Sequence, residues 1–295
     1  MTKHIPVLLR EAIEILNPKL GEFFIDGTLG GGGHTLAIAE RLGNFGKMLC
    51  VDWDKNAVEH FKKPEGRDVP EIIVKNANYR DIPELLKEEN LPKADGLILD
   101  LGFSSDQIED PERGFSFQHD GPLDMRYSGE YQSAADIVNQ YREHELETLF
   151  HAFGGERYAG RIAKAICEVR KKKKFETTKE LEDVIYHVVP VAARKGKIHP
   201  ATRVFQALRI AVNHELENVA LILKAIPECV KPGGRVGIIT FHSLEDKVVK
   251  EGFKDLVKNG RAELLHKKPI APQRDETRIN PRSRSAKIRS IKIIS

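Results

Sequence analysis

Apolar runs and segments with helical spacing alternate along the first hundred residues of the chain. Four runs are apolar almost throughout, and they cover residues 22–26, 47–52, 71–74 and 94–101. Between these runs, apolar residues recur at helical spacing over residues 34–42, from about residue 56, and over residues 83–89. Strands that are apolar on both faces and separated by helices are typical of a parallel sheet covered on both sides. The pattern therefore predicts a doubly wound α/β sheet.

The alternation stops after the fourth apolar run, and residues 105–202 show no strand pattern. Helix-start and helix-stop signals occur there instead: two N-terminal capping pairs and one pair of glycines. They are Ser133 with Asp136, Thr177 with Glu180, and Gly154 with Gly155. A long helical segment starts near Pro200, and we expect a break near its middle. We therefore expect a helical insertion over residues 106–205.

Strand signals resume near the end of the chain. We expect a tight turn at residues 231–234, a fifth strand over 235–241 and a helix over 245–259. Residues 262–266 and 287–294 predict two more strands, with no helix between them, that form an antiparallel edge hairpin. Five parallel strands followed by a reversed strand form the sheet of class I methyltransferases. Residues 1–105 and 206–295 would make this discontinuous domain.

The composition is that of a globular protein that remains inside the cell. Charged residues make up 31% of the 295 residues, and no apolar run approaches the ~18 residues of a membrane-spanning helix. The N-terminal segment meets polar residues too early for a signal peptide. Three distant cysteines exclude a disulfide framework and a CxxC metal site. We expect a cytoplasmic protein without a membrane partner.

Positive charge is concentrated in two segments of the chain. The whole chain carries +3, yet residues 161–203 and 261–295 each carry +7, which leaves −11 for the rest. The first of these segments contains four consecutive lysines, Lys171–Lys174. Such segregation is typical of proteins that bind a polyanion, although lysine runs are also common on ordinary solvated surfaces.

A glycine-rich loop follows the first predicted strand, in the segment FFIDGTLGGGGHT. No register of Gly27–Gly33 gives the G-x-G-x-x-G pattern of dinucleotide sites, and no lysine follows as a P-loop requires. S-adenosylmethionine remains, because it has no phosphate to bind. A tight turn without a ligand is the alternative.

Two residues on neighbouring strands could complete a cofactor site. Asp52 ends the second strand, where a carboxylate can accept hydrogen bonds from both ribose hydroxyls. Tyr79 follows the third strand and could lie against an adenine ring. NAD sites use a similar acid, and a partly buried tyrosine is ordinary, so neither residue decides the ligand.

Further polar residues follow the fourth and fifth strands. Asp100 ends the fourth strand at the edge where α/β sheets bind ligands, and Gln107 follows it. The fifth strand ends with Thr240, His242 and Ser243. His242 could relay a proton or serve the scaffold, and Ser243 with Asp246 is a good N-cap pattern for the next helix. The histidines show no metal-ligand spacing, so we expect no metal.

Seven segments of the chain together resemble one protein family nearly word for word and in the same order. They are HIPVLLREAIEIL, IDGTLGGGGHT, LDLGFSSDQIED, RGFSF with DGPLDMR, HPATRVFQALRIAVNHELE, PGGRVGIITFHSLEDKVVK and NPRSRSAKIR. On these motifs the chain resembles the RsmH (MraW) family of bacterial methyltransferases, which act on cytosine N4 in small-subunit ribosomal RNA.

The resemblance implies a class I methyltransferase domain, interrupted by a helical domain, that uses S-adenosyl-L-methionine without a metal. It implies 16S rRNA, free or in the assembled small subunit, as the substrate, and a cytidine of the decoding region as the target. Cofactor contacts carried over from the family fall on Gly32, Gly33, His34, Asp52, Tyr79, Asp100 and Gln107.

Cytosine N4 is a poor nucleophile, so a hydrogen-bond acceptor should assist the transfer. The candidates are Asp100, a nearby backbone carbonyl and His242. Two rival functions stay open: a methyltransferase of the same fold acting on DNA or another RNA, and a non-catalytic RNA-binding assembly factor.

Overall fold

The chain folds into two compact units. The computed structural model describes residues 5–102, 105–129, 131–194, 196 and 198–295. One unit comprises Met1–Ser104 and Leu216–Ser295, and the other comprises Ser105–Glu215. We call them the sheet unit and the helical unit. From the sequence we expect boundaries at 105/106 and 205/206. In the structure the second boundary lies after Glu215, so the whole helix Ala201–Val212 belongs to the helical unit.

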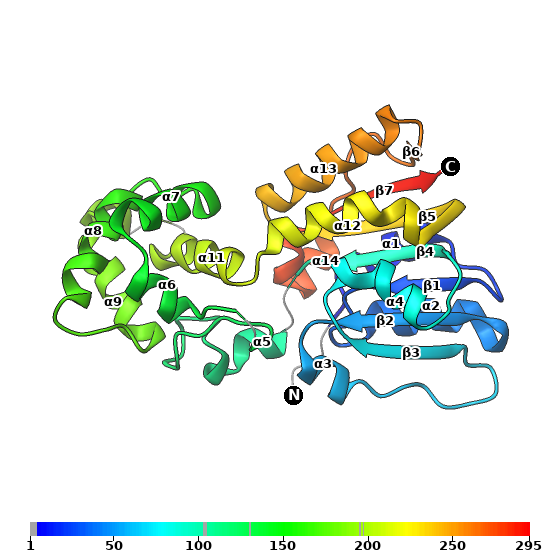
Figure 1. Cartoon of the computed structure of the whole chain (residues 1–295), viewed down its shortest axis with the longest axis horizontal. Coiled ribbons are helices and arrows are strands. Elements are labelled where there is room, and N and C mark those ends of the chain that lie inside the picture. Colours follow the sequence, from blue (N-terminus) through cyan, green and yellow to red (C-terminus); the bar gives the residue numbers. More distant parts are fainter. Residues whose placement is uncertain (1–4, 103–104, 130, 195, 197) are drawn as a thin grey trace. The chain divides into compact units, whose positions relative to one another are not determined.

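The sheet unit is built on seven strands in the order β3-β2-β1-β4-β5-β7-β6 (Figure 1). The first five strands of the chain are parallel, and β7 pairs antiparallel with both β5 and β6. The strands are Phe23–Asp26 (β1), Lys47–Asp52 (β2), Glu71–Asn76 (β3), Ala94–Asp100 (β4), Val230–Thr240 (β5), Ala262–Leu264 (β6) and Lys287–Ile293 (β7). This arrangement confirms the predicted α/β class and the class I methyltransferase sheet.

Alternate residues of each strand enter two separate apolar cores, because successive side chains of a strand point to opposite faces. Ile25 and Leu97 lie in the core that includes side chains of α4, α12 and α13, whereas Phe24 and Ile98 lie in the core with α1 and α2. Both faces are therefore covered, which explains why the strands are apolar throughout. The helices of this unit are Leu9–Leu16 (α1), Gly33–Leu42 (α2), Lys55–His60 (α3), Ile82–Glu88 (α4), Glu215–Cys229 (α12), Ser243–Lys258 (α13) and Arg274–Ile279 (α14).

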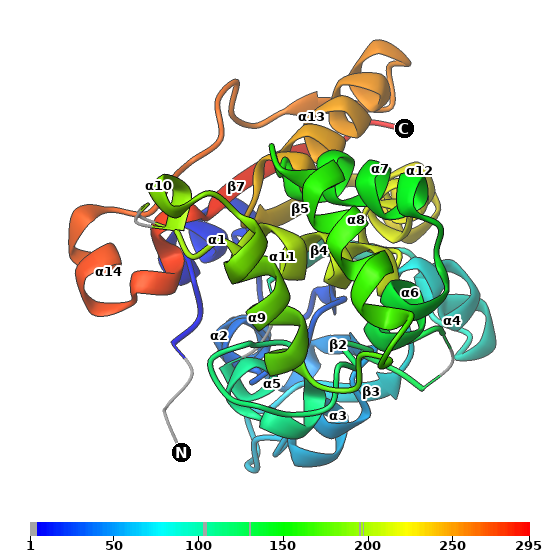
Figure 2. The ribbon, with the colours of Figure 1, turned by 90° about the vertical axis from the view of Figure 1, so that its left-hand side faces the viewer.

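The helical unit has its own apolar core. Its helices are Ser105–Glu109 (α5), Ala134–Gln140 (α6), Glu143–Gly154 (α7), Ala159–Arg170 (α8), Thr178–Val188 (α9), Val191–Arg194 (α10) and Ala201–Val212 (α11). Both predicted capping pairs are confirmed as complete capping boxes, at α6 and α9. Gly155 ends α7 in a left-handed conformation, with φ of 59°, as the glycine pair predicts. Figure 2 shows α11 beside α9 within this unit.

The long helical segment near residue 200 is broken where the two units meet in the sequence. Helix α11 ends at Val212 and α12 begins at Glu215. His214 between them has a φ of 49°, which a regular α-helix cannot contain. The expected break is therefore confirmed, and the division between the units falls beside it.

Two expectations for the C-terminal region differ from the structure. Strand β5 begins at Val230, before the tight turn expected at residues 231–234, and not after it. The register with β4 passes from Ala94–Val230 to Gly96–Arg235, so residues 231–234 lie opposite Asp95 alone, and Gly233 there has φ of 87°. The edge hairpin of β6 and β7 is confirmed, but α14 and a 3-10 segment, Pro281–Ser285, lie between its strands. A helix of six residues is too short to show an apolar period.

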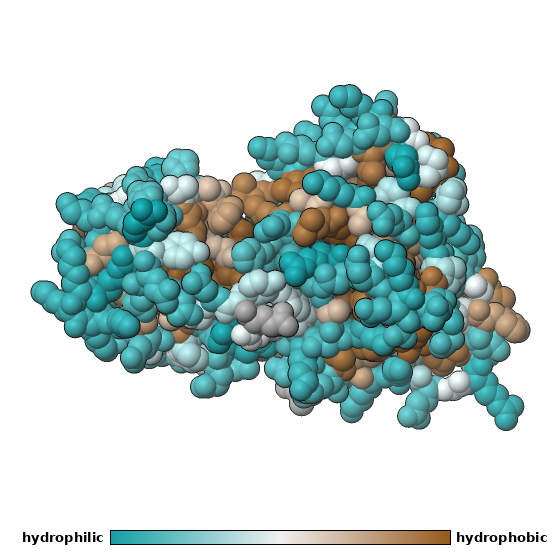
Figure 3. Space-filling view, viewed as in Figure 1, coloured by the Kyte–Doolittle hydropathy of each residue, from teal (hydrophilic) through white to brown (hydrophobic). Residues whose placement is uncertain are grey.

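The polar surface and the cysteines without disulfide bonds agree with what the composition predicts. The face seen in Figure 3 is largely hydrophilic, with apolar residues in smaller groups. All three cysteines are buried and unpaired. Within the described ranges, none of the helices combines the length and the apolar character needed to cross a membrane.

Candidate cofactor-binding and active site

Three acidic residues end three neighbouring strands of the sheet. Asp26 ends β1, Asp52 ends β2 and Asp100 ends β4, and β1 lies between the other two. Because these strands are parallel, their carboxyl ends meet at one edge of the sheet. This is the edge at which α/β sheets bind ligands.

Asp52 connects the glycine loop to the strand beside it. Its Oδ2 accepts a hydrogen bond from the Gly30 backbone N–H at 2.7 Å, and its Oδ1 accepts one from the Asp54 N–H at 2.8 Å. Burial raises the pKa of Asp52 to about 6, and these two hydrogen bonds oppose that shift. Each carboxylate oxygen still has a lone pair, so the group can accept further hydrogen bonds from ligand hydroxyls.

At the start of α2 the backbone of the glycine loop carries no side chains of its own. Gly32 has φ of +77°, and a Cβ built on it would lie 2.5 Å from the Phe61 ring. A Cβ on Gly33 would lie 2.8 Å from Cγ of Pro6. A side chain at Gly32 would force Phe61 to move and would be strained at this φ, and one at Gly33 would force Pro6 to move. The first N–H groups of α2 have no partner within the helix, and they favour a negatively charged ligand group.

His34 lies beside Asp100 at the start of α2. The His34 side chain is buried, and its Nδ1 lies 3.8 Å from Oδ2 of Asp100. Burial raises the pKa of Asp100 to about 6, while the neighbouring imidazole of His34 acts in the opposite direction. The Asp100 side chain is 16% exposed. It is therefore a partly accessible carboxylate that is mostly ionised at neutral pH.

Asp26 holds this edge of the sheet together, and it was not among the predicted site residues. Its Oδ2 accepts a hydrogen bond from the Thr35 hydroxyl at 2.6 Å, and its Oδ1 accepts one from the Thr28 N–H at 3.0 Å. The hydroxyl of Thr28 accepts a hydrogen bond from the Asp100 N–H at 2.6 Å. Burial raises the pKa of Asp26. Its place at a strand end, directly before glycines, is the sequence signal that could have indicated it.

Tyr79 lies next to Gly27, which directly follows β1. It begins a 3-10 segment, Tyr79–Asp81, which follows β3 after two residues. A Cβ added to Gly27 would lie 3.1 Å from Cβ of Tyr79, so the tyrosine packs closely against the end of β1. The half-buried ring also packs against the core that contains α4.

The capping residue expected for α13 is wrong by one position. His242 is the N-cap: its Nδ1 accepts a hydrogen bond from the Glu245 N–H at 3.3 Å, and Glu245 completes a capping box. Ser243 is exposed and is the first residue of the helix. Asp246 does not cap the helix, because its carboxylate binds the Arg289 guanidinium at 2.7 Å. The Thr240 hydroxyl is directed to the Lys287 carbonyl of β7, at 3.4 Å.

The tautomer of His242 follows from this cap. Because Nδ1 accepts a hydrogen bond, the neutral ring carries its hydrogen on Nε2. This buried Nε2 has no hydrogen-bond partner among the described residues, although it lies 3.0 Å from Oε1 of Glu245. The neutral side chain can therefore donate a hydrogen bond, but it cannot accept a proton on Nε2.

The comparisons with known proteins now decide the family. A family model described as the MraW methylase family matches residues 1–294. The chain belongs to this family. The resemblance drawn from the sequence motifs is thereby confirmed.

Curated relatives match the chain along almost its whole length. Ribosomal RNA small subunit methyltransferase H of Syntrophus aciditrophicus is 44% identical over 306 residues, which cover 97% of this chain and 96% of that protein. The protein of the same name from Elusimicrobium minutum is 46% identical over 291 residues, covering 97% of each. Among solved structures, an rRNA methylase from Streptococcus thermophilus matches with a TM-score of 0.42 and 9% identity, covering 97% of this chain and 94% of that one.

The sheet unit of this MraW-family chain contains all but one of the residues carried over for cofactor contacts. These six lie on the loop after β1, at the start of α2, or at and just beyond the ends of β2, β3 and β4: Gly32, Gly33, His34, Asp52, Tyr79 and Asp100. Gln107 is buried on α5 of the helical unit. The cofactor contacts expected of all seven residues stay predictions.

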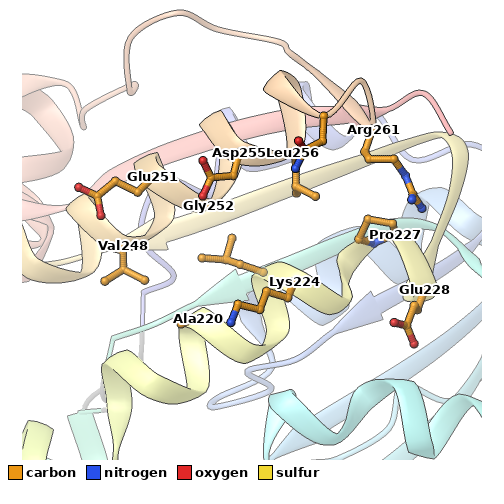
Figure 4. Close-up of a pocket in the computed structure, with 12 residues that line it drawn as sticks. Ala220, Lys224, Pro227, Glu228, Val248, Glu251, Gly252, Asp255, Leu256 and Arg261 are labelled. Carbon is orange, nitrogen blue, oxygen red and sulfur yellow. The ribbon is translucent and has the colours of Figure 1, made fainter.

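A surface groove of the sheet unit lies away from these residues. It has a volume of about 730 Å³ and runs between α12 and α13 (Figure 4). Its lining is of mixed charge, with Lys224, Glu251 and Asp255 among the residues drawn. None of the predicted site residues lines it.

Proposed function

We propose that this protein methylates N4 of a cytidine in the decoding region of small-subunit (16S) rRNA, with S-adenosylmethionine as the methyl donor. The observation that carries the proposal is the match to the MraW methylase family over residues 1–294. The curated relatives, named as small-subunit rRNA methyltransferases, support the substrate. These relatives are bacterial, so the proposal places the reaction in the bacterial cytoplasm.

The residues at the strand ends suit S-adenosylmethionine. Asp52 offers carboxylate lone pairs to ribose hydroxyls, and Asp100 offers a partly accessible negative charge near a cationic ligand. The start of α2 presents backbone N–H groups that suit the carboxylate of the methionine moiety. The loop lacks the lysine of a P-loop, and a ligand without phosphates does not need one.

Catalysis by this chain would consist mainly of orientation and proton acceptance. When bound, S-adenosylmethionine supplies a methyl carbon whose bond to sulfur breaks with the electron pair passing to sulfur as N4 attacks. The amino group then has one proton to lose, because a neutral amine has formed a fourth bond. Holding the base in line with the methyl group lowers the entropic part of the barrier.

Asp100 is the side chain best suited to receive that proton. Its carboxylate makes only long contacts with described residues, at 3.5 Å to the Gly102 N–H and 3.8 Å to His34. A pKa of about 6 leaves it ionised at pH 7 and still able to take up a proton. His242 is less suited, because its Nδ1 accepts the hydrogen bond of the helix cap and its buried Nε2 lies 3.0 Å from Oε1 of Glu245.

The two basic segments would bind the RNA backbone. In the helical unit Lys172 and Lys174 are exposed, and in the sheet unit Arg274, Arg278 and Arg284 are exposed. Lysine and arginine bind phosphates with a strong dependence on salt. The target base must leave its stack to reach the strand ends, so an unpaired or splayed segment of RNA is the expected substrate.

Labelled methyl transfer tests the function directly. The protein is incubated with labelled S-adenosylmethionine and, in parallel, with small subunits lacking the modification, free 16S rRNA and DNA. We expect label in N4-methylcytidine, identified by mass spectrometry of the nucleosides, from one or both rRNA substrates. The Asp100→Ala variant should lose most of this activity, with Asp95→Ala, a change at another acid of β4, as the comparison. Label in DNA alone, in another nucleoside, or in none of the substrates would refute the proposal.

A further inference from the structure

One peptide group near the N-terminus is hydrogen-bonded on both sides by distant parts of the chain. The Val7 carbonyl oxygen accepts a hydrogen bond from Nε2 of His34 at 3.0 Å. The Leu8 N–H donates to Oε1 of Glu276, on α14, at 2.8 Å. This carbonyl and this N–H belong to the same planar peptide unit. The peptide therefore joins a carboxylate of the basic C-terminal segment to the histidine of the glycine loop.

The segment that contains this peptide is held in place from both sides. Asn280, just after α14, donates from Nδ2 to the Ile5 carbonyl at 3.0 Å. Pro6 packs against Gly33, so closely that a Cβ there would lie 2.8 Å from the proline ring. Figure 2 shows α14 beside α1, which this segment precedes.

Leu8 has a backbone conformation that its surroundings must enforce. It is fully buried and has φ of 53°, in the left-handed region that residues with a side chain rarely adopt. It is also the N-cap of α1 without a side-chain cap of its own. The hydrogen bond to Glu276 satisfies the Leu8 N–H in this conformation.

The hydrogen bond to Val7 decides which nitrogen of His34 carries its hydrogen. A carbonyl oxygen can only accept, so the hydrogen of the neutral ring lies on Nε2. The other nitrogen, Nδ1, lies 3.8 Å from Oδ2 of Asp100, whose ionised form favours a hydrogen there, so the Val7 oxygen and Asp100 act in opposite directions on the tautomer. The negative charge of Glu276 polarises the peptide and makes the Val7 oxygen a stronger acceptor. The Glu276 carboxylate therefore favours the tautomer of His34 that carries its hydrogen on Nε2.

We propose that Glu276 is a positioning residue for the cofactor site: through the Val7–Leu8 peptide it fixes the orientation and the tautomer of His34. This inference rests on the proposed function, because His34 is assigned there to the cofactor. It extends the site to α14, a short helix of the C-terminal segment. Its residue Glu276 lies 268 positions after Leu8 in the sequence.

Two variants of Glu276 and one matched control test this role. Glu276→Ala removes the acceptor, Glu276→Gln keeps an acceptor oxygen without the charge, and Asp275→Ala removes the same charge from the neighbouring, exposed position. Calorimetry gives the Kd of S-adenosylmethionine. Long-range proton–nitrogen NMR of the ligand-free protein gives the tautomer of His34, with its signals assigned from a His34→Gln variant.

We expect Glu276→Ala to raise the Kd about fivefold to tenfold, the loss of one charge-assisted hydrogen bond, and to mix the two His34 tautomers. Glu276→Gln should lie between the wild type and Glu276→Ala, and Asp275→Ala should match the wild type. An unchanged Kd together with a pure Nε2–H tautomer in Glu276→Ala would overturn the inference. If Glu276→Ala does not fold, Glu276→Gln decides: wild-type values for both measurements overturn it.

The same experiment separates the failure of this inference from the failure of the proposed function. If the wild-type protein does not bind S-adenosylmethionine, the proposed function fails. The tautomer measurement in the ligand-free protein still tests the link between Glu276 and His34. If the wild type binds and Glu276→Ala behaves identically, only the inference fails.

Discussion

Affinity for S-adenosylmethionine should fall steeply as the pH drops from 7.5 to 5.0. Burial raises the pKa of both Asp52 and Asp100 to about 6, and both groups are expected to bind the cofactor in their ionised form. A carboxyl group of this pKa is ionised in about 97% of molecules at pH 7.5 and in about 9% at pH 5.0. Between pH 7.5 and 5.0, protonation of each group therefore weakens binding about tenfold, or by about 1.4 kcal/mol. Protonation of both weakens it about a hundredfold.

The same shifts affect the stability of the ligand-free protein in the opposite direction. Because the folded pKa of each group lies above the unfolded value of 3.8, the folded state takes up more protons between pH 3.8 and about 6. Lowering the pH through this window therefore stabilises the fold as far as these two groups are concerned. Weaker binding at pH 5.0 would then not result from unfolding through these carboxylates.

Calorimetric titrations at half-unit pH intervals measure this effect, with circular dichroism at each pH as a check that the protein is folded. S-adenosylhomocysteine, which keeps the ribose but lacks the sulfonium charge, should show the Asp52 part of the dependence. Asp52→Asn and Asp100→Asn should each bind more weakly at pH 7.5 and show a shallower pH profile. A Kd that stays constant between pH 7.5 and 5.0 in a folded protein would refute the assignment of these carboxylates.

Three further predictions concern the loop, the helical unit and the RNA. Gly32→Ala should weaken cofactor binding at least tenfold by calorimetry, since its Cβ would lie 2.5 Å from the Phe61 ring at a φ of +77°. Thr177→Ala should lower the free energy of unfolding of the helical unit by about 1 kcal/mol in a urea titration, and Thr177→Ser should restore it. Replacing Lys172 and Lys174 by alanine should reduce the magnitude of the slope of log K against log salt for rRNA by roughly 1.4 to 1.8, while an unchanged slope would exclude them as phosphate contacts.

The strands and the capped helices could be predicted because their signals are local. The alternate packing of Phe24 and Ile25 into different cores requires residues that are apolar on both faces, and this is visible in the sequence. Ser133 and Thr177 cap their own helices through residues three positions away. Such contacts are set within one turn of the chain and do not depend on distant partners.

The errors arose where a distant residue decides the local structure. Asp246 appeared suited to a cap with Ser243, but Arg289 from β7 binds its carboxylate, and His242 caps the helix instead. Helix α14 has no apolar period, and its Glu276 binds the backbone of Leu8 near the other end of the chain. Single-sequence patterns carry no information on such pairs.

The three acids at the strand ends differ in how many short hydrogen bonds the protein donates to their carboxylates. This difference distinguishes a structural acid from one that is available to a ligand. Asp26 receives short hydrogen bonds from Thr35 and Thr28, and its side chain is buried, so it builds the loop. Asp52 receives two backbone N–H groups and can still accept hydroxyl groups of a ligand. Asp100 has only long contacts with described residues, which therefore compensate its charge the least of the three. A buried carboxylate in that state costs free energy until a cation approaches, which is why we assign it to the sulfonium and the reacting amine.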